Sequence, residues 1–168
     1  VADMKVDFQG NVTHSEFYEG IMKSHARVTY GEAQEVIDGA TPDAFKHVEH
    51  VILKANDLAK IFMAKRFREG ALDLEIPETE LILDETGMPI DIQRSERIFA
   101  HKLIEEMMLA ANVAVAKFIG DNEEPVLYRI HEQPKMDNIE TLNHYLKNFG
   151  SSKKLGTKKL QKDISAAL

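Results

Sequence analysis

Apolar and polar residues alternate at the start of the chain, which is the pattern of a β-strand with one buried face. The alternation runs from Met4 to Phe8, and Gly10-Asn11 supplies turn residues before a second extended run towards Met22. The same spacing returns in three short runs: Leu72–Ile76, Leu81–Leu83 and Ile90–Ile92. A further short strand is expected over Val126–Ile130, where Val126, Leu127, Tyr128 and Ile130 are apolar or aromatic. The pattern predicts a hairpin at the start of the chain and several further short strands, with a turn between the runs at 81–83 and 90–92.

Apolar residues at three- and four-residue steps predict five helices. Thr29 and Glu32 have the spacing of a capping box and predict the start of the first helix. Thr41-Pro42 predicts the N-cap and first turn of the second, which is expected to run to about Glu69 with Gly70 at its C-cap. The other three are expected over Glu96–Ile119, from a second capping box at Asp137 and Glu140, and over Leu160–Leu168.

The helix expected over Glu96–Ile119 is the most informative. From Met107 onwards it is apolar on nearly every face, which is typical of a helix that is buried all round. If the rest of the chain covers only part of it, the bare face predicts self-association of the isolated chain. Helices and strands occur in blocks rather than in strict alternation, so we expect an α+β fold in which short antiparallel strands pack around this long buried helix.

A line of polar residues interrupts one face of that helix. His101, Glu105 and Asn112 lie on the same face as Ile98, Leu109 and Ala116. One interpretation is a core network in which His101 and Glu105 bond at i,i+4. The other is that Glu105 faces a channel and accepts hydrogen bonds from ligand hydroxyls. Tyr30 also has two interpretations: it is a packed aromatic, or it is a platform on which a base or ribose stacks.

Composition limits the possible functions. The chain has 168 residues, a formal net charge of -7 and no cysteine, which excludes disulfide scaffolds and thiolate metal sites and fits the cytoplasm. Its length suits one domain or most of a larger one, and its first residue, Val1, already belongs to a strand pattern, so we expect a cropped segment. No long apolar run predicts a membrane span. The acidity is a weak argument against nucleic-acid binding.

Common catalytic motifs are missing from the sequence. It contains no GxGxxG or GxxxxGK[ST] loop, no HExxH and no GxSxG, so a nucleotide-binding loop, a zinc hydrolase site and a serine nucleophile are all disfavoured. Adjacent acids such as Asp84-Glu85 fall in expected turns and are interpreted as solvated surface.

Four stretches resemble the ribonuclease II and ribonuclease R family, and most closely its ribonuclease R branch: SHARVTY, FREGALDLEIPE, ERIFAHKLIEEMMLAAN and LYRIHEQP. They occur in the family's order along essentially the whole chain. The resemblance implies that residues 1–168 are a central fragment of an RNB catalytic domain. It implies a hydrolase, a processive 3'-to-5' exoribonuclease that degrades single-stranded RNA to nucleoside monophosphates with Mg²⁺.

The same resemblance implies which residues contact RNA and which catalytic groups lie elsewhere. Tyr30 matches the tyrosine of the family's HARLTY-like motif and Glu105 the first glutamate of its LIEE motif, and both are expected to line the RNA channel and help select ribose. Leu74 falls where some members place an aromatic that packs on the terminal bases. The family's metal-binding aspartates and its catalytic arginine have no counterpart here, so no catalytic residue, no bound metal and no activity are expected for this chain alone.

Two other interpretations stay open. The chain is alternatively a non-catalytic RNA-binding or regulatory module, or a helical interaction domain. The encoding reading frame separates the first from an enzyme segment, because the enzyme requires an aspartate cluster upstream and a Ser-Pro-Ile-Arg-Arg-like run downstream.

Overall fold

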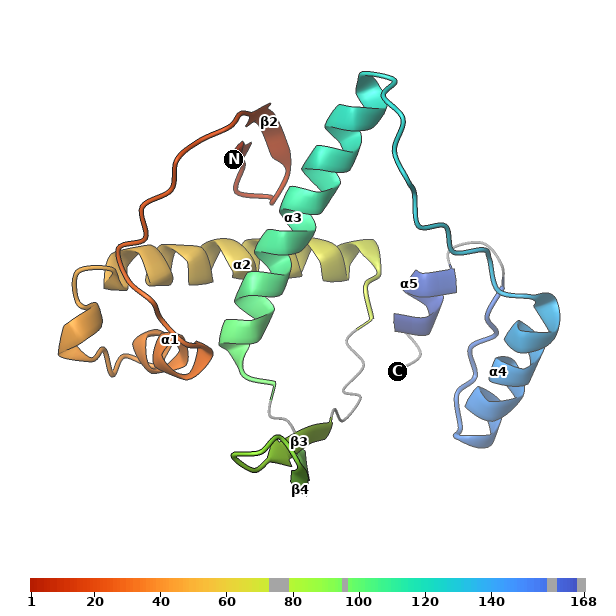
Figure 1. The fold of residues 1–168 in the computed structure, drawn as a ribbon. Coiled ribbons are helices and arrows are strands. Elements are labelled where there is room, and N and C mark those ends of the chain that lie inside the picture. Colours follow the sequence, from red (N-terminus) through yellow and green to blue (C-terminus); the bar gives the residue numbers. More distant parts are fainter. Residues whose placement is uncertain (73–78, 95–96, 157–159, 166–168) are drawn as a thin grey trace.

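Three helices form the centre of the fold. A computed structural model describes residues 1–72, 79–94, 97–156 and 160–165. Helix α2 (Glu49–Glu69) and helix α3 (Phe99–Asp121) cross, and the short helix α1 (Tyr30–Ile37) lies against both near the start of α3 (Figure 1). Their contact is built largely from small and aliphatic side chains, since Val36, Ala59 and Ala100 are almost completely buried. Small residues allow the helix backbones to approach closely where they cross.

The predicted N-terminal hairpin is confirmed and packs on α3. Strands β1 (Ala2–Val6) and β2 (Val12–Phe17) are antiparallel, with Ala2 opposite Phe17. The ring of Phe17 lies 4.8 Å from that of Phe118 in the second half of α3. β2 ends at Phe17, so the extended run expected towards Met22 is shorter than its apolar residues indicate, and Ile21 and Met22 are exposed.

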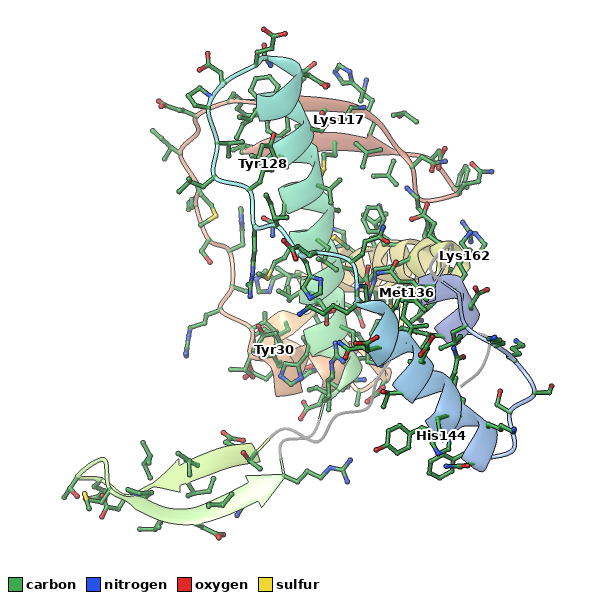
Figure 2. All side chains as sticks on the ribbon, turned by 90° about the vertical axis from the view of Figure 1, so that its right-hand side faces the viewer. Tyr30, Lys117, Tyr128, Met136, His144 and Lys162 are labelled. Atoms are coloured by element: carbon green, nitrogen blue, oxygen red, sulfur yellow. The ribbon has the colours of Figure 1, made fainter. Side chains whose placement is uncertain are left out.

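The second hairpin projects away from the helices. Strands β3 (Thr79–Leu83) and β4 (Pro89–Arg94) pair antiparallel, with Leu81 opposite Ile92, and the ribbon extends beyond the body of the molecule (Figure 2). Leu81, Ile90 and Ile92 are all more than half exposed. The mixed α+β fold is therefore confirmed, but the second hairpin does not pack around the long helix as expected.

Helix α2 starts later than predicted. Thr41-Pro42 leads into a short 3₁₀ helix, η1 (Asp43–Phe45), and the α-helix begins at Glu49 after Val48. The Thr41 hydroxyl hydrogen-bonds the Glu49 carboxylate instead of capping its own turn. The predicted end is correct, because Gly70 closes α2 with φ +104°. A Cβ at Gly70 would also lie 2.7 Å from Cγ of Lys162 in helix α5 (Leu160–Ser165), so glycine is needed there for both conformation and space.

Two predictions in the C-terminal third are wrong, and one in the middle of the chain lies largely outside the described residues. Val126–Ile130 forms no strand, since no described neighbour pairs with it. Helix α4 (Met136–Asn148) begins one residue before Asp137 and follows Lys135, without a side-chain cap. Asn143, in the middle of α4, attaches the segment that follows the helix, because its amide group exchanges two hydrogen bonds with the backbone of the buried Leu155. The strand expected at Leu72–Ile76 falls largely on residues that are not described.

Helix α3 is not buried all round within this chain. Ala100, Leu103 and Ala114 are buried, but Met108, Val113 and Phe118 are 58%, 67% and 48% exposed. The β1–β2 hairpin covers one side of the second half of α3, and Tyr128 approaches Gly120 near its end. The apolar pattern therefore requires more neighbours than the described residues supply. Among those residues no helix, α3 included, is long and apolar enough to cross a membrane.

Candidate functional site

A capping box sets the position of Tyr30. Thr29 precedes α1, and its amide and hydroxyl both donate to Oε2 of Glu32 at 2.7 Å, while its Oγ1 accepts from the Glu32 amide at 3.4 Å. These hydrogen bonds hold the pKa of Glu32 below its usual range, with the Thr29 amide as the main cause. The predicted capping box is confirmed. It leaves Tyr30, the first residue of the helix, 47% exposed at the surface.

Tyr30 lies against the polar line of α3. Its ring centroid is 4.3 Å from that of His101, with the rings tilted by 49°. Gln34, one turn along α1, accepts a hydrogen bond from the Ala100 amide at 3.0 Å through its side-chain oxygen. A side chain of α1 thus satisfies a free amide in the first turn of α3. This contact keeps Tyr30 next to the first turn of α3 (Figure 2).

Glu105 is held between two arginines. Nη2 of Arg66 is 3.7 Å from Oε1 of Glu105, and Nη2 of Arg97 hydrogen-bonds Oε2. The Glu105 side chain remains 38% exposed. His101 and Glu105 therefore use Tyr30 and the arginines as partners, rather than the i,i+4 bond that the core-network interpretation requires.

The neighbouring glutamate is the buried one. Glu106 is 3% exposed, and its Oε1 accepts from Nε and Nη2 of Arg66 at 3.0 and 2.5 Å. Sequence reasoning missed this pair. A signal was present, because Glu106 interrupts the apolar stripe formed by Ala100, Leu103 and Ala114 on α3, and a carboxylate on such a stripe needs a buried partner. The identity of the partner, Arg66, could not be read from the stripe.

Two adjoining pockets lie beside Tyr30. The first, about 370 Å³, is bounded by Tyr30, Ile52 of α2 and Ile104 of α3. The second, about 430 Å³, shares Val28, Val51 and Ile52 with it and is lined by three histidines, His25, His47 and His50. Both volumes are in the range of small-ligand sites. Sequence analysis had found no role for these histidines.

The described residues include neither a metal-binding cluster nor Leu74. Within the described ranges, no three His, Asp or Glu side chains are grouped so that they could hold a metal ion. The described residues therefore do not fit the Mg²⁺ that the family resemblance implies for the enzyme. Leu74 lies outside the described residues. Tyr30, in contrast, contacts His101, and Glu105 lies one turn after His101 on the same face of α3.

Comparison with known proteins gives the family. The RNB domain model matches residues 1–168. Ribonuclease R of Aquifex aeolicus is 36% identical over 150 residues, which cover 88% of this chain and 21% of that protein. Ribonuclease R of Thermotoga maritima is 35% identical over 158 residues, covering 93% and 22%. The chain thus spans about a fifth of the length of these relatives.

Solved structures agree in fold. The structure of Mycoplasma genitalium RNase R in complex with ribose methylated single-stranded RNA matches with a TM-score of 0.86 at 24% identity, over 99% of this chain and 26% of the other. The same enzyme in complex with double-stranded RNA matches with a TM-score of 0.85, over 30% of its chain. The family model covers every residue and the fold agrees over nearly the whole length, so the chain belongs to the RNB domain family.

Proposed function

We propose that this chain is the central part of the catalytic domain of a processive 3'-to-5' exoribonuclease that degrades single-stranded RNA to nucleoside monophosphates in the cytoplasm. Its role in that enzyme is to line the RNA channel. The family match and the ribonuclease R relatives support this proposal. The observation that carries it is the packing of Tyr30 on His101, beside an open pocket that Tyr30 lines. Glu105 lies one turn after His101 on the same face of α3.

The chemistry of these two residues suits single-stranded RNA. The half-exposed ring of Tyr30 offers a face on which a base or ribose can stack. An ionised carboxylate is purely a hydrogen-bond acceptor, and a ribose 2'-OH is a donor that DNA lacks. Glu105 and Tyr30 can therefore bind a nucleotide and also distinguish a ribonucleotide from a deoxyribonucleotide.

Hydrolysis in this proposal depends on groups outside the described residues. A divalent ion in such nucleases activates water and stabilises the developing charge, and the described residues contain no cluster to hold it. We assign this chain the binding and orientation of RNA. The metal ligands belong, in the proposal, to other parts of the enzyme.

The test is RNA selectivity of the intact enzyme. We expect Glu105→Gln, and Tyr30→Ala, to lower the ratio of RNA to DNA affinity more than they lower general binding. Glu105→Gln keeps an oxygen acceptor but replaces a charge-assisted hydrogen bond to the 2'-OH by a neutral one, which costs about 1–1.5 kcal/mol, or roughly a five- to tenfold change. Dissociation constants for an RNA strand and for DNA of the same sequence give the ratio.

Glu35→Gln is the matched control, because Glu35 is an exposed acid on the same helix as Tyr30. It should leave the ratio unchanged. If Glu105→Gln and Tyr30→Ala both keep the parent selectivity, the assignment of these two residues to the RNA channel is wrong. RNA binding without nuclease activity by the complete protein would instead favour a non-catalytic RNA-binding or regulatory module.

A further inference from the structure

Arg66 joins the exposed Glu105 to the buried Glu106. Its Nε and Nη2 donate to Oε1 of Glu106, and the same Nη2 lies 3.7 Å from Oε1 of Glu105. Glu106 is 3% exposed whereas the side chains of Arg66 and Glu105 are 35% and 38% exposed. One guanidinium therefore connects a carboxylate fixed in the core with a carboxylate at the surface.

The position of Arg66 follows from the buried face of α2. Phe62 and Ala59, one and two turns earlier on the same face, are 8% and 0% exposed. The guanidinium carbon of Arg66 also lies 5.6 Å from the centre of the Phe67 ring. Packing around the aliphatic stem leaves the head group at the edge of the α2–α3 contact, where it reaches both glutamates.

Stability alone does not explain the Arg66–Glu106 pair. Moving a carboxylate out of water is costly, and apolar residues of similar volume in place of a buried pair are often equally stable or more so. The local arrangement indicates a different benefit. Two hydrogen bonds to Glu106 fix the guanidinium, which then lies 3.7 Å from one oxygen of Glu105, close enough to attract it, while Arg97 hydrogen-bonds the other oxygen.

We propose that Arg66 is a positioning residue that orients the Glu105 carboxylate for the ribose 2'-OH, with Glu106 as its anchor in the core. The inference rests on the proposed function of Glu105. Each carboxylate oxygen has two lone-pair sites, so both oxygens keep acceptor capacity for RNA beside the arginines. Orientation of Glu105 before RNA arrives lowers the entropy that binding must remove.

Lysine cannot replace Arg66 in this role. A guanidinium is a rigid planar fork that donates in several directions, whereas an ammonium is a single point charge on a flexible stem. Arg66→Lys keeps the charge next to Glu106 but loses the fixed reach to Glu105. We therefore expect a protein that folds normally and selects RNA less well.

The experiment measures the RNA-to-DNA ratio of dissociation constants in the intact enzyme. Arg66→Lys is expected to lower the ratio by about three- to tenfold with DNA affinity unchanged, and its melting temperature checks that the protein remains folded. Adding it to Glu105→Gln should cause little further loss, because the charged carboxylate that Arg66 orients is already gone. Glu106→Gln, which keeps the shape but removes the anchoring charge, is a second variant that should lower the ratio in the same direction.

Arg68→Lys is the control, since Arg68 lies at the same end of α2 but donates to the Gln9 carbonyl in the N-terminal hairpin. It should keep the parent ratio. If Arg66→Lys and Glu106→Gln also keep the parent ratio while Glu105→Gln lowers it, the positioning role is wrong and the proposed function stands. If Glu105→Gln instead has the same RNA-to-DNA ratio as the parent enzyme, both the proposed function and this inference are wrong.

Discussion

Glu32 is the residue whose ionisation most directly affects the position of Tyr30. Two hydrogen bonds from Thr29 lower the pKa of its carboxyl below the ordinary value of 4.5. A lowered pKa in the folded state means that the stabilisation is present above the unfolded-state pKa and is lost as the pH falls through the folded-state pKa. The start of α1, and with it Tyr30, is thus expected to loosen in acid.

We predict that Glu32→Gln weakens the acid dependence of stability below about pH 4.5. Urea unfolding of the parent and the variant, measured in steps from pH 7 to pH 3, gives the two slopes. The dependence should not vanish, because hydrogen bonds also lower the pKa values of Asp7 and Asp84 and contribute in the same pH window. Glu35→Gln should follow the parent curve, and an identical curve for Glu32→Gln would contradict the prediction.

At the level of elements, the Arg66–Glu106 pair is the polar link in the contact between α2 and α3. Its two members differ in their access to water. Glu106 is buried, whereas Arg66 is about one-third exposed. Removal of Arg66 leaves a buried carboxylate without this counter-charge, whereas removal of Glu106 leaves a partly exposed guanidinium without it.

We predict that Arg66→Met destabilises the chain more than Glu106→Leu does. Arg66→Met leaves a carboxylate in the core with no partner, and loss of one partner of a buried pair costs about 3–5 kcal/mol. After Glu106→Leu the guanidinium can turn towards water, so the cost should be smaller. Chemical denaturation measures both free energies of unfolding, and equal losses would show that Arg66 depends on Glu106 as much as the reverse.

The two hairpins show how an element depends on its surroundings. The β1–β2 hairpin has a helix to pack on, and the turn at Gly10 fits against α2, where a Cβ would lie 3.3 Å from Ile61. The β3–β4 hairpin exposes its apolar residues on a projecting ribbon (Figure 2). A two-stranded hairpin is only marginally stable alone, so the second one requires a partner surface.

For the whole molecule, the exposed apolar side chains exceed what one isolated chain normally leaves in water. They lie on α3 and on the β3–β4 hairpin, and they include Met108, Val113, Phe118, Ile90 and Ile92. Large contiguous apolar patches are uncommon on monomers because each buried aliphatic or aromatic side chain contributes about 1.5–3 kcal/mol.

We therefore predict that the isolated 168-residue chain self-associates. Sedimentation velocity at several concentrations should show a rising average mass, and a dye for apolar surface should bind. Val113→Glu, which places a charge on the most exposed of the three α3 side chains, should reduce both signals. If the chain is a monomer at every concentration and binds no dye, the prediction is wrong.

We also predict that the isolated chain releases no mononucleotides from RNA at any Mg²⁺ or Mn²⁺ concentration. Two-metal hydrolysis needs carboxylates that hold the ions about 4 Å apart, and the described residues have no such cluster. Incubation of purified chain with end-labelled RNA measures the release. Robust metal-dependent release of mononucleotides would show that this chain itself contains the catalytic groups.

Local features of the sequence determined much of the secondary structure, and the resemblance of its motifs to the RNB family singled out Tyr30 and Glu105 as candidates. The Thr29–Glu32 capping box, the end of α2 at Gly70 and the β1–β2 hairpin each depend on residues close together in the chain, so short patterns predict them. Where short patterns failed, a nearby alternative was available, as when Thr41 bonded Glu49 instead of starting the helix. Val126–Ile130 had strand-forming residues but no described strand to pair with.

The tertiary structure alone decided how the site is assembled. Arg66 and Glu106 are 40 positions apart, and Tyr30 meets His101 only because α1 packs against α3. Periodicity shows that a residue belongs to a buried face, but it does not show which element covers that face. Partner choice depends on the crossing of α2 and α3, which is set by the packing of many side chains at once, and that is why Glu106 and Arg66 emerged from the structure and not from the sequence.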